Sequence, residues 1–127
     1  QVKCKQETTL ETVMLKDSLC FAPGDRETIV ERCGQCPEKR VLITHGTDTM
    51  VETAAMAGSR RLGKTVVLTG AMIPVTVVNS DAQFNLGFAF CAVQALPAGV
   101  YIAMNGKIFT WDNVRKNKEL GEFQTLG

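Results

Sequence analysis

Short apolar segments alternate with segments of helical spacing along most of this sequence. Three runs rich in β-branched residues, Arg40–Thr44, Thr65–Thr69 and Val100–Met104, have the composition of buried strands. Apolar residues at helical spacing follow the first run over Thr49–Leu62, and a largely apolar helix is predicted over Ala82–Leu96. This order predicts a parallel sheet with right-handed helical crossovers.

The N-terminal part gives weaker signals. Leu10–Leu19 has apolar residues at its centre and is predicted to be a strand, whereas residues 1–9 are polar and either pair at a sheet edge or remain loose. A helix is predicted over Asp25–Arg32, because a proline precedes it and an acidic residue opens its first turn. Gly34 and Pro37 are expected to end that helix.

The remaining segments are predicted as connections and one short strand. Ile73–Asp81 contains proline, asparagine and serine and is predicted to be a loop across the top of the sheet. Asn105-Gly106 is a turn signal, after which Lys107–Trp111 is predicted to return as a short antiparallel strand. From Asp112 onward the sequence is charged and poorly periodic. The predicted fold class is therefore α/β, a three-layer sandwich of about four to five mostly parallel strands with helices on both faces.

Composition and charge narrow the functional classes. The chain has 127 residues, which predicts one domain over residues 1–127, and its 45% hydrophobic content is ordinary for a globular protein. The net charge is +1, and no basic stripe with interleaved aromatic residues indicates nucleic-acid binding. No apolar run approaches the roughly 20 residues of a membrane span, and no signal peptide is visible. We therefore expect neither a nucleic-acid nor a membrane partner.

Cysteine content predicts a reducing, cytoplasmic setting. Five cysteines cannot all pair within one chain. Cys33-Gly34-Gln35-Cys36 resembles a redox or zinc half-site, but it follows a predicted helix, and the negative end of a helix disfavours a thiolate. A zinc site would need further ligands, and His45 is the only histidine. We expect a structural or incidental role for this pair, with no metal and no organic cofactor.

Polar and small residues follow three of the predicted strands at their carboxyl ends. These residues are Ser18, Thr47-Asp48 and Gly70-Ala71. In an open α/β sheet the carboxyl ends of the strands share one edge, and ligands bind there. Ordinary helix capping and turn formation is the alternative interpretation, since threonine and aspartate are common caps. A small polar ligand would suit the edge, because hydroxyls and helix-start amides bind a carboxylate and Asp48 can accept hydrogen bonds from an ammonium group.

The stretch Ile43–Met50, Ile-Thr-His-Gly-Thr-Asp-Thr-Met, closely resembles the second signature of the bacterial-type L-asparaginase and glutaminase-asparaginase family. The resemblance extends through Lys16–Leu19, Thr69–Met72 and Ser80–Gly87, and covers residues 10 to 118. It implies hydrolysis of the side-chain amide of L-asparagine or L-glutamine to the acid and ammonia. Leu19, where many secreted members carry glutamine, indicates the cytoplasmic-type branch. A homo-oligomer, dimer or tetramer, is also implied.

The resemblance also implies roles for individual residues. Thr47 and Asp48 match the family's catalytic pair, and Lys116 matches the lysine that works with it. Gly46 lies on the same substrate-binding turn. Ser18 would bind the substrate α-carboxylate, and Ala71 would offer its carbonyl oxygen to the side-chain amide. From composition alone, Lys116 belongs to a solvated charged face.

Three polar residues near these positions are predicted to have structural roles. His45 is not one of the family's catalytic residues, so we read it as structural. Asp81 and Asn85 are expected to shape the loop and the following helix start rather than touch substrate.

Two family features do not occur within the 127 residues. The sequence contains no Thr-Gly-Gly-Thr signature, which supplies the family's usual nucleophilic threonine, and no small C-terminal domain. We therefore expect a truncated domain of the asparaginase N-terminal type, whose activity as an isolated chain is open. The alternatives are a non-catalytic module that binds an amino acid and a structural fragment that assembles into oligomers.

Overall fold

The computed structural model describes residues 4–127 and contains one main sheet. Its strands are β1 (Arg40–Thr44), β2 (Thr65–Thr69), β3 (Gly99–Met104) and β4 (Lys107–Thr110), in the order β1-β2-β3-β4. The first three are parallel, and β4 returns antiparallel to β3 after the Asn105-Gly106 turn. The predicted mixed, mostly parallel sheet and its antiparallel return are therefore confirmed.

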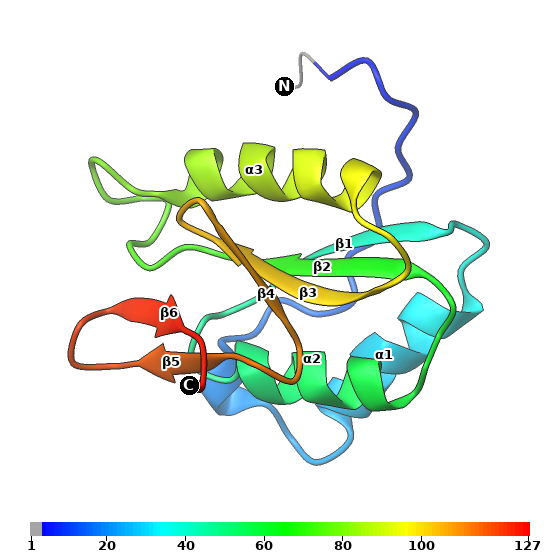
Figure 1. Ribbon diagram of the computed structural model, residues 1–127, viewed down its shortest axis with the longest axis horizontal. Coiled ribbons are helices and arrows are strands. Elements are labelled where there is room, and N and C mark those ends of the chain that lie inside the picture. The colour runs from blue at the N-terminus through cyan, green and yellow to red at the C-terminus, as the bar shows by residue number, and fades with distance from the viewer. Residues whose placement is uncertain (1–3) are drawn as a thin grey trace.

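Helices cover both faces of this sheet (Figure 1). The helices α1 (Asp25–Gln35) and α2 (Met50–Ser59) lie on one face, and α3 (Ala82–Ala95) lies on the other. Side chains alternate accordingly along β2, where Val66 and Leu68 pack toward α2 and Val67 packs toward α3. The three-layer sandwich predicted from the sequence is the observed architecture.

Two helix ends differ from the prediction. We expected Gly34 and Pro37 to end the first helix; α1 continues through Gly34 to Gln35, and Cys36, directly before Pro37, is its C-cap. Cys36 is extended, with ψ 151°, because the following Pro37 disfavours helical geometry in the residue before it. The second helix ends at Ser59 instead of Leu62, and Gly63, with φ +72°, completes the turn into β2.

The predicted strand over Leu10–Leu19 is wrong. The structure has irregular backbone from residue 4 to residue 17, followed by a single 3-10 turn over Ser18–Cys20. Leu10 and Leu15 are each 92% exposed. Apolar composition alone does not make a strand, since the backbone needs a hydrogen-bonded neighbour, and this segment pairs with no strand in the described part of the chain. The predictions for residues 1–3 lie outside the described residues.

A second, two-stranded sheet forms where no periodicity was visible. Its strands are β5 (Arg115–Asn117) and β6 (Glu122–Gln124), which pair antiparallel. Val114 and Phe123 are buried in the core between the main sheet and the α1–α2 layer, so they anchor this hairpin to the domain. Figure 1 shows the hairpin beside the end of the molecule where the parallel strands finish and α2 begins.

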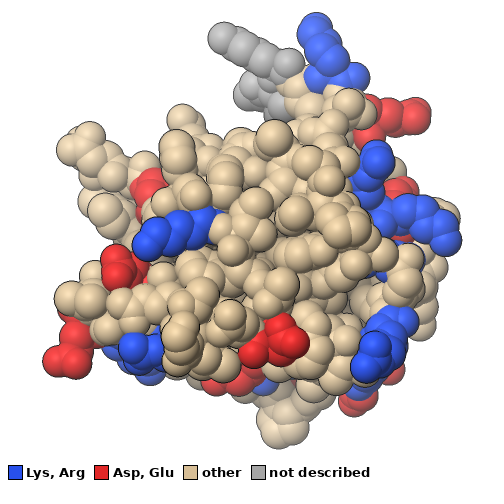
Figure 2. Space-filling model, in the orientation of Figure 1, with Lys and Arg blue, Asp and Glu red and all other residues tan. Residues whose placement is uncertain are grey.

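On the face of the molecule that Figure 2 shows, basic and acidic groups lie interspersed around a central region without charged groups. Among residues 4–127, no helix is long and apolar enough to cross a membrane.

Candidate active site

The turn between β1 and α2, residues 45–49, forms the centre of the candidate site. The strand hydrogen bonding ends with the His45 amide, which donates to the Thr69 carbonyl oxygen at 2.9 Å. Thr47 and Asp48 then lie immediately before α2, which begins at Met50. The positive end of the α2 dipole therefore faces the turn and favours a negatively charged ligand there.

Lys116 contacts both candidate catalytic residues of this turn. Its Nζ donates to Thr47 Oγ1 at 2.9 Å and to Asp48 Oδ1 at 2.8 Å. The Lys116 side chain is only 13% exposed, against 35% for Asp48. The alternative of a solvated charged face is therefore wrong for Lys116, although it fits the exposed Lys118. The hydrogen bond from Lys116 lowers the pKa of Asp48, so this carboxylate is ionised at neutral pH.

Ser18 lies against the same turn from a distant part of the sequence. It is 2% exposed, and its Oγ accepts a hydrogen bond from the Thr49 amide at 3.3 Å. Gly46 permits this approach, because a Cβ at that position would lie 3.0 Å from Ser18 Oγ. The serine hydroxyl hydrogen remains able to donate to a ligand, since its oxygen is the acceptor in this bond.

The Ala71 backbone is fixed by a polar cluster formed by Asp81, Asn85 and Asn105. Asp81 accepts hydrogen bonds from the amides of Met72 and Ile73 at 3.1 and 3.0 Å. The Asn85 side chain donates to the Gly70 carbonyl oxygen at 2.9 Å and to Asp81 at 2.8 Å, and its Oδ1 accepts from the Asn105 amide. The residues on both sides of Ala71 are thereby held. The prediction that Asp81 and Asn85 shape this loop is confirmed.

The charge on Asp81 is stabilised by these donors. Partial burial by itself raises the pKa of the carboxyl group, but the hydrogen bonds from Ile73, Asn105, Met72 and Asn85 together outweigh it and lower the pKa to about 2. Asp81 is therefore an anion at every physiological pH. Asn105, with φ +51°, was visible in the sequence only as a turn residue, and its contact with Asp81 at 2.9 Å was missed.

His45 is held by neighbours on both of its ring nitrogens. Nδ1 lies 2.7 Å from the Gly46 carbonyl oxygen and Nε2 lies 2.8 Å from Thr53 Oγ1. A carbonyl oxygen only accepts, so Nδ1 carries the hydrogen and Nε2 accepts from the threonine hydroxyl. Arg26 Nε in turn donates to Thr53 Oγ1 at 2.8 Å. Burial lowers the pKa of His45, so the ring is neutral at pH 7, and the structural interpretation of this residue is confirmed.

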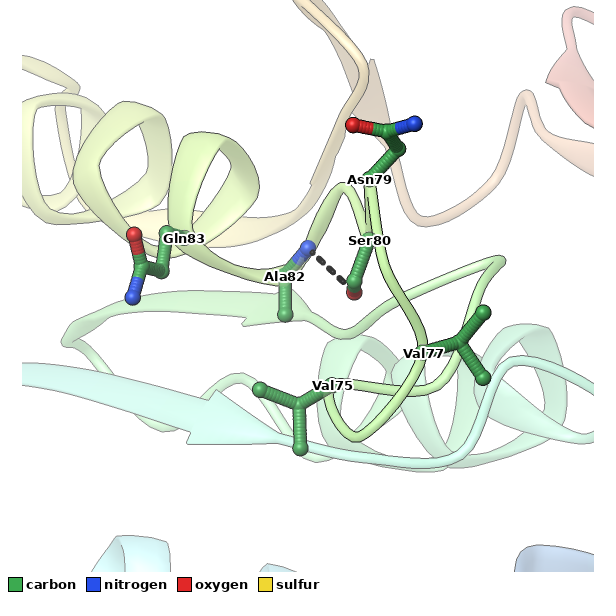
Figure 3. Close-up of a pocket in the computed structure, with 6 residues that line it drawn as sticks. All are labelled: Val75, Val77, Asn79, Ser80, Ala82 and Gln83. Carbon is green, nitrogen blue, oxygen red and sulfur yellow. Dashed lines mark hydrogen bonds between the residues drawn. The ribbon is translucent and has the colours of Figure 1, made fainter.

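Two surface hollows lie outside this constellation. The one in Figure 3, of about 220 Å³, is lined by the loop after β2 and the start of α3: Val75, Val77, Asn79, Ser80, Ala82 and Gln83. Ser80 Oγ accepts from the Ala82 amide at 3.1 Å across its wall (Figure 3). The other, of about 300 Å³, has Arg61, Lys64 and Trp111 in its lining. Neither contains Ser18, Thr47, Asp48 or Lys116. The chemistry of the β1–α2 turn, not hollow size, therefore identifies the candidate site.

The described residues offer no metal centre. No group of three or more His, Cys, Asp or Glu side chains within residues 4–127 is arranged to hold a metal ion. The groups assembled at the β1–α2 turn are a threonine hydroxyl, an aspartate, a lysine and a serine hydroxyl. Such a set can bind a zwitterion and move protons.

Comparisons with known proteins identify relatives of the chain. Residues 1–124 match the family described as "Asparaginase, N-terminal". The chain is 40% identical over 116 residues to an L-asparaginase of Thermococcus kodakarensis, a match that covers 87% of this chain and 35% of the relative. It is 32% identical over 114 residues to L-asparaginase 1 of Escherichia coli K12, a match that covers 86% of this chain and 34% of the relative. The chain thus spans about a third of the length of these curated relatives.

Solved structures give the same result. The thermostable L-asparaginase from Thermococcus kodakarensis superposes with a TM-score of 0.76 at 35% identity, covering 87% of this chain and 35% of that one. A probable cytoplasmic L-asparaginase from Campylobacter jejuni superposes with a TM-score of 0.81 at 31% identity, covering 91% of this chain and 40% of that one. The family match takes in nearly the whole chain, including the turn with Thr47 and Asp48 and the hairpin with Lys116. The chain therefore belongs to the asparaginase family, in the part described as the N-terminal domain.

Proposed function

We propose that the site formed by Thr47, Asp48 and Lys116 hydrolyses the side-chain amide of L-asparagine, with L-glutamine as a second substrate. The observation that carries the proposal is the position of Lys116 Nζ, within hydrogen-bond distance of Thr47 Oγ1 and Asp48 Oδ1 at once. Membership of the asparaginase family supports this choice of reaction. The products are the corresponding acid and ammonia.

Thr47 is the proposed nucleophile. A threonine hydroxyl attacks an amide carbon only when a base removes its proton, and Lys116 is the basic group in contact with it. In the structure, Lys116 donates to Thr47 Oγ1, so it must lose a proton before it can accept one. A substrate ammonium group at Asp48 would compete with Lys116 for the carboxylate, and the proton that Lys116 gives up would pass to water. The proton taken from Thr47 would then pass to the departing ammonia, and water would hydrolyse the ester left on Thr47.

The remaining residues of the site are proposed to hold the substrate. The Ser18 hydroxyl would donate to the α-carboxylate, which also lies favourably near the positive end of α2. Asp48, ionised at neutral pH, would accept from the α-ammonium group. Gly46 would keep the turn close to Ser18, and the Ala71 carbonyl oxygen would accept from the side-chain amide. These groups support a small amino acid as the substrate class.

Ammonia release from L-asparagine and from L-glutamine tests the proposal. We expect turnover by the 127-residue chain at high concentration, its loss in Thr47→Val, and partial retention in Thr47→Ser, which keeps the hydroxyl. Lys116→Met should lower kcat by about 10² to 10⁴, the usual contribution of a positioned general base. Lys118→Met is the matched control and should leave kcat unchanged, because Lys118 is exposed.

Calorimetric titration with L-aspartate and L-asparagine separates catalysis from binding. Turnover that survives Thr47→Val would disprove the role of the hydroxyl. Heat of binding without turnover would show that the chain is an amino-acid-binding module instead. The absence of both binding and turnover would contradict the assignment of the site altogether.

We propose further that residues 1–127 form one α/β domain, that the protein is cytoplasmic and that it assembles as a homo-oligomer. The five free cysteines and the likeness to a probable cytoplasmic relative support the location. Exposed apolar side chains on the loop after β2 and on α3 support self-association, with Val75 69%, Val78 83% and Phe84 62% exposed. Sedimentation velocity over a range of concentrations tests the assembly.

A further inference from the structure

The end of α1 meets the start of β2 at a buried lysine that the proposed reaction does not use. Lys64 is 8% exposed, and its Nζ donates to the backbone carbonyl oxygens of Cys33, at 2.7 Å, and of Gly34 and Cys36. These are carbonyls of the last turn of α1 and its C-cap. The lysine therefore holds a full positive charge at the negative end of a helix.

This ammonium group has no carboxylate partner. Four ion pairs occur among residues 4–127, and Lys64 belongs to none of them. Burying a charge without an opposite charge is unfavourable, and carbonyl oxygens are the acceptors that offset it here. The hydrogen-bond partner of Lys64 that can ionise is the Cys36 thiol, whose Sγ lies 3.5 Å from Nζ.

The two cysteines of the Cys33-Gly34-Gln35-Cys36 motif lie in different surroundings. Cys33 is buried, and burial first, then the proximity of Cys36, raises the pKa of its thiol to about 11. It remains a neutral thiol at physiological pH. Cys36 is half-buried and extended at the helix C-cap, and its thiol donates to the Cys33 carbonyl oxygen at 3.5 Å.

We propose that Cys36 is a peroxide-sensitive modification site, activated by Lys64 and unrelated to the amide-hydrolysing site. Reactive cysteines are typically accessible and have a cationic neighbour, and Cys36 combines half-burial with Lys64 Nζ at 3.5 Å from its sulfur. The sulfur attacks one oxygen of a hydroperoxide, forming the S–O bond of a sulfenic acid as the O–O bond breaks. The sulfur loses two electrons, and the second oxygen leaves as hydroxide or alkoxide and takes a proton from water.

The sequence alone predicts an inert pair, because the carbonyls at a helix C-terminus disfavour negative charge. Lys64 reverses this expectation. A helix end carries roughly half an elementary charge, whereas the ammonium group carries a whole one and lies among the same carbonyls. The contact was not visible in the sequence, since Lys64 comes 28 residues after Cys36.

Competition among the cysteines of the folded chain is the direct test. The 127-residue protein is treated with hydrogen peroxide at pH 7 for increasing times, and sulfenic acids are trapped with dimedone and located by peptide mass mapping. Cys4, Cys20 and Cys91 are exposed and serve as internal references. Because Lys64 Nζ lies against the sulfur, we expect the Cys36 adduct to form on the order of tenfold faster than the reference adducts. Cys33 should stay unlabelled.

Two further measurements assign the effect to Lys64. In Lys64→Met, with folding checked by circular dichroism, the rate of adduct formation at Cys36 should fall to that of the reference cysteines. In urea, where the Lys64 contact is lost, the five cysteines should react alike, so the test does not depend on whether the variant folds. A Cys36 rate no greater than that of Cys4, Cys20 and Cys91 in the folded protein would overturn the proposal. A rate advantage that persists in folded Lys64→Met or in urea would overturn the role of Lys64.

Discussion

Lys116 Nζ and Asp48 Oδ1 lie 2.8 Å apart, although 68 residues separate them in the sequence. The two side chains are 13% and 35% exposed, so this pair is neither fully buried nor a freely solvated surface contact. Pairs of this kind contribute modestly to stability, because partial solvent access screens the charges. Their geometry matters more for the proton chemistry proposed at Thr47.

The coupling between these two residues can be measured directly. In a double-mutant cycle of Asp48→Asn and Lys116→Met, we expect a coupling free energy of about 1 kcal/mol from urea unfolding. The cycle of Asp48→Asn with Lys118→Met is the matched comparison and should give a smaller value, because Lys118 acts on Asp48 through its charge without a hydrogen bond. Equal coupling in the two cycles would show that Asp48 responds to general charge rather than to the contact with Lys116.

Gly46 and Gly87 form a pair of glycine substitutions with opposite expected effects. In Gly46→Ala the new Cβ would lie 3.0 Å from Ser18 Oγ and 3.2 Å from Ser18 Cβ, so the turn or the serine must move. We expect destabilisation of about 1–3 kcal/mol and weaker amino-acid binding. Gly87 lies inside α3 with open space around its Cβ position, so Gly87→Ala should stabilise the protein by up to about 1 kcal/mol. Thermal unfolding of both variants checks the contrast.

Acid should destabilise the protein through Asp81. Its folded-state pKa of about 2 lies below the ordinary value of 3.8, so its stabilising contribution is complete above about pH 4 and is lost as pH falls toward 2. The contribution is at most about 2.5 kcal/mol, before any reduction by solvent screening. Asp81→Asn should be less stable than the native protein at pH 7, and the difference should shrink at pH 2. A difference that is the same at both pH values would contradict this assignment.

Thr53 is expected to connect Arg26 to His45. Thr53→Val preserves shape but removes the hydroxyl that accepts from Arg26 and donates to His45 Nε2. Because Thr53 is fully buried, leaving these partners unsatisfied should cost about 1–3 kcal/mol. Nitrogen-15 NMR of the single histidine should report the Nδ1–H tautomer in the native protein and a mixture in the variant. Thr53→Ser, which keeps the hydroxyl, should preserve the native tautomer.

The sequence was sufficient for the elements whose signals are local. The strands β1, β2 and β3 were predicted because a strand buried on both faces reads as a continuous apolar run, and the β4 return because Asn105-Gly106 marks a tight turn. Leu10–Leu19 has a similar composition, but strand formation depends on a neighbouring strand that local composition does not report. The β5–β6 hairpin was missed because its strands have three residues each, too few to show a period.

The candidate site was predictable only in part for a related reason. Residues at strand ends could be brought together by the topology of a parallel sheet, which placed Thr47, Asp48 and Ala71 at one edge. Lys116 lies in no such position, and only resemblance to a family indicated it. Asn105 and Lys64 act through contacts with residues far away in the sequence, so they had no recognisable pattern.

Because the β5–β6 hairpin carries Lys116, the site can form only late in the synthesis of the chain. Lys116 reaches Thr47 and Asp48 only from a hairpin that Val114 and Phe123 hold against the core. When the strands β1, β2 and β3 have left the ribosome, most of the core has been synthesised. The proton-transfer residues are still incomplete, because Lys116 comes later in the chain. Site assembly must wait for the second hairpin strand, so partly synthesised chains would carry the aspartate without its lysine.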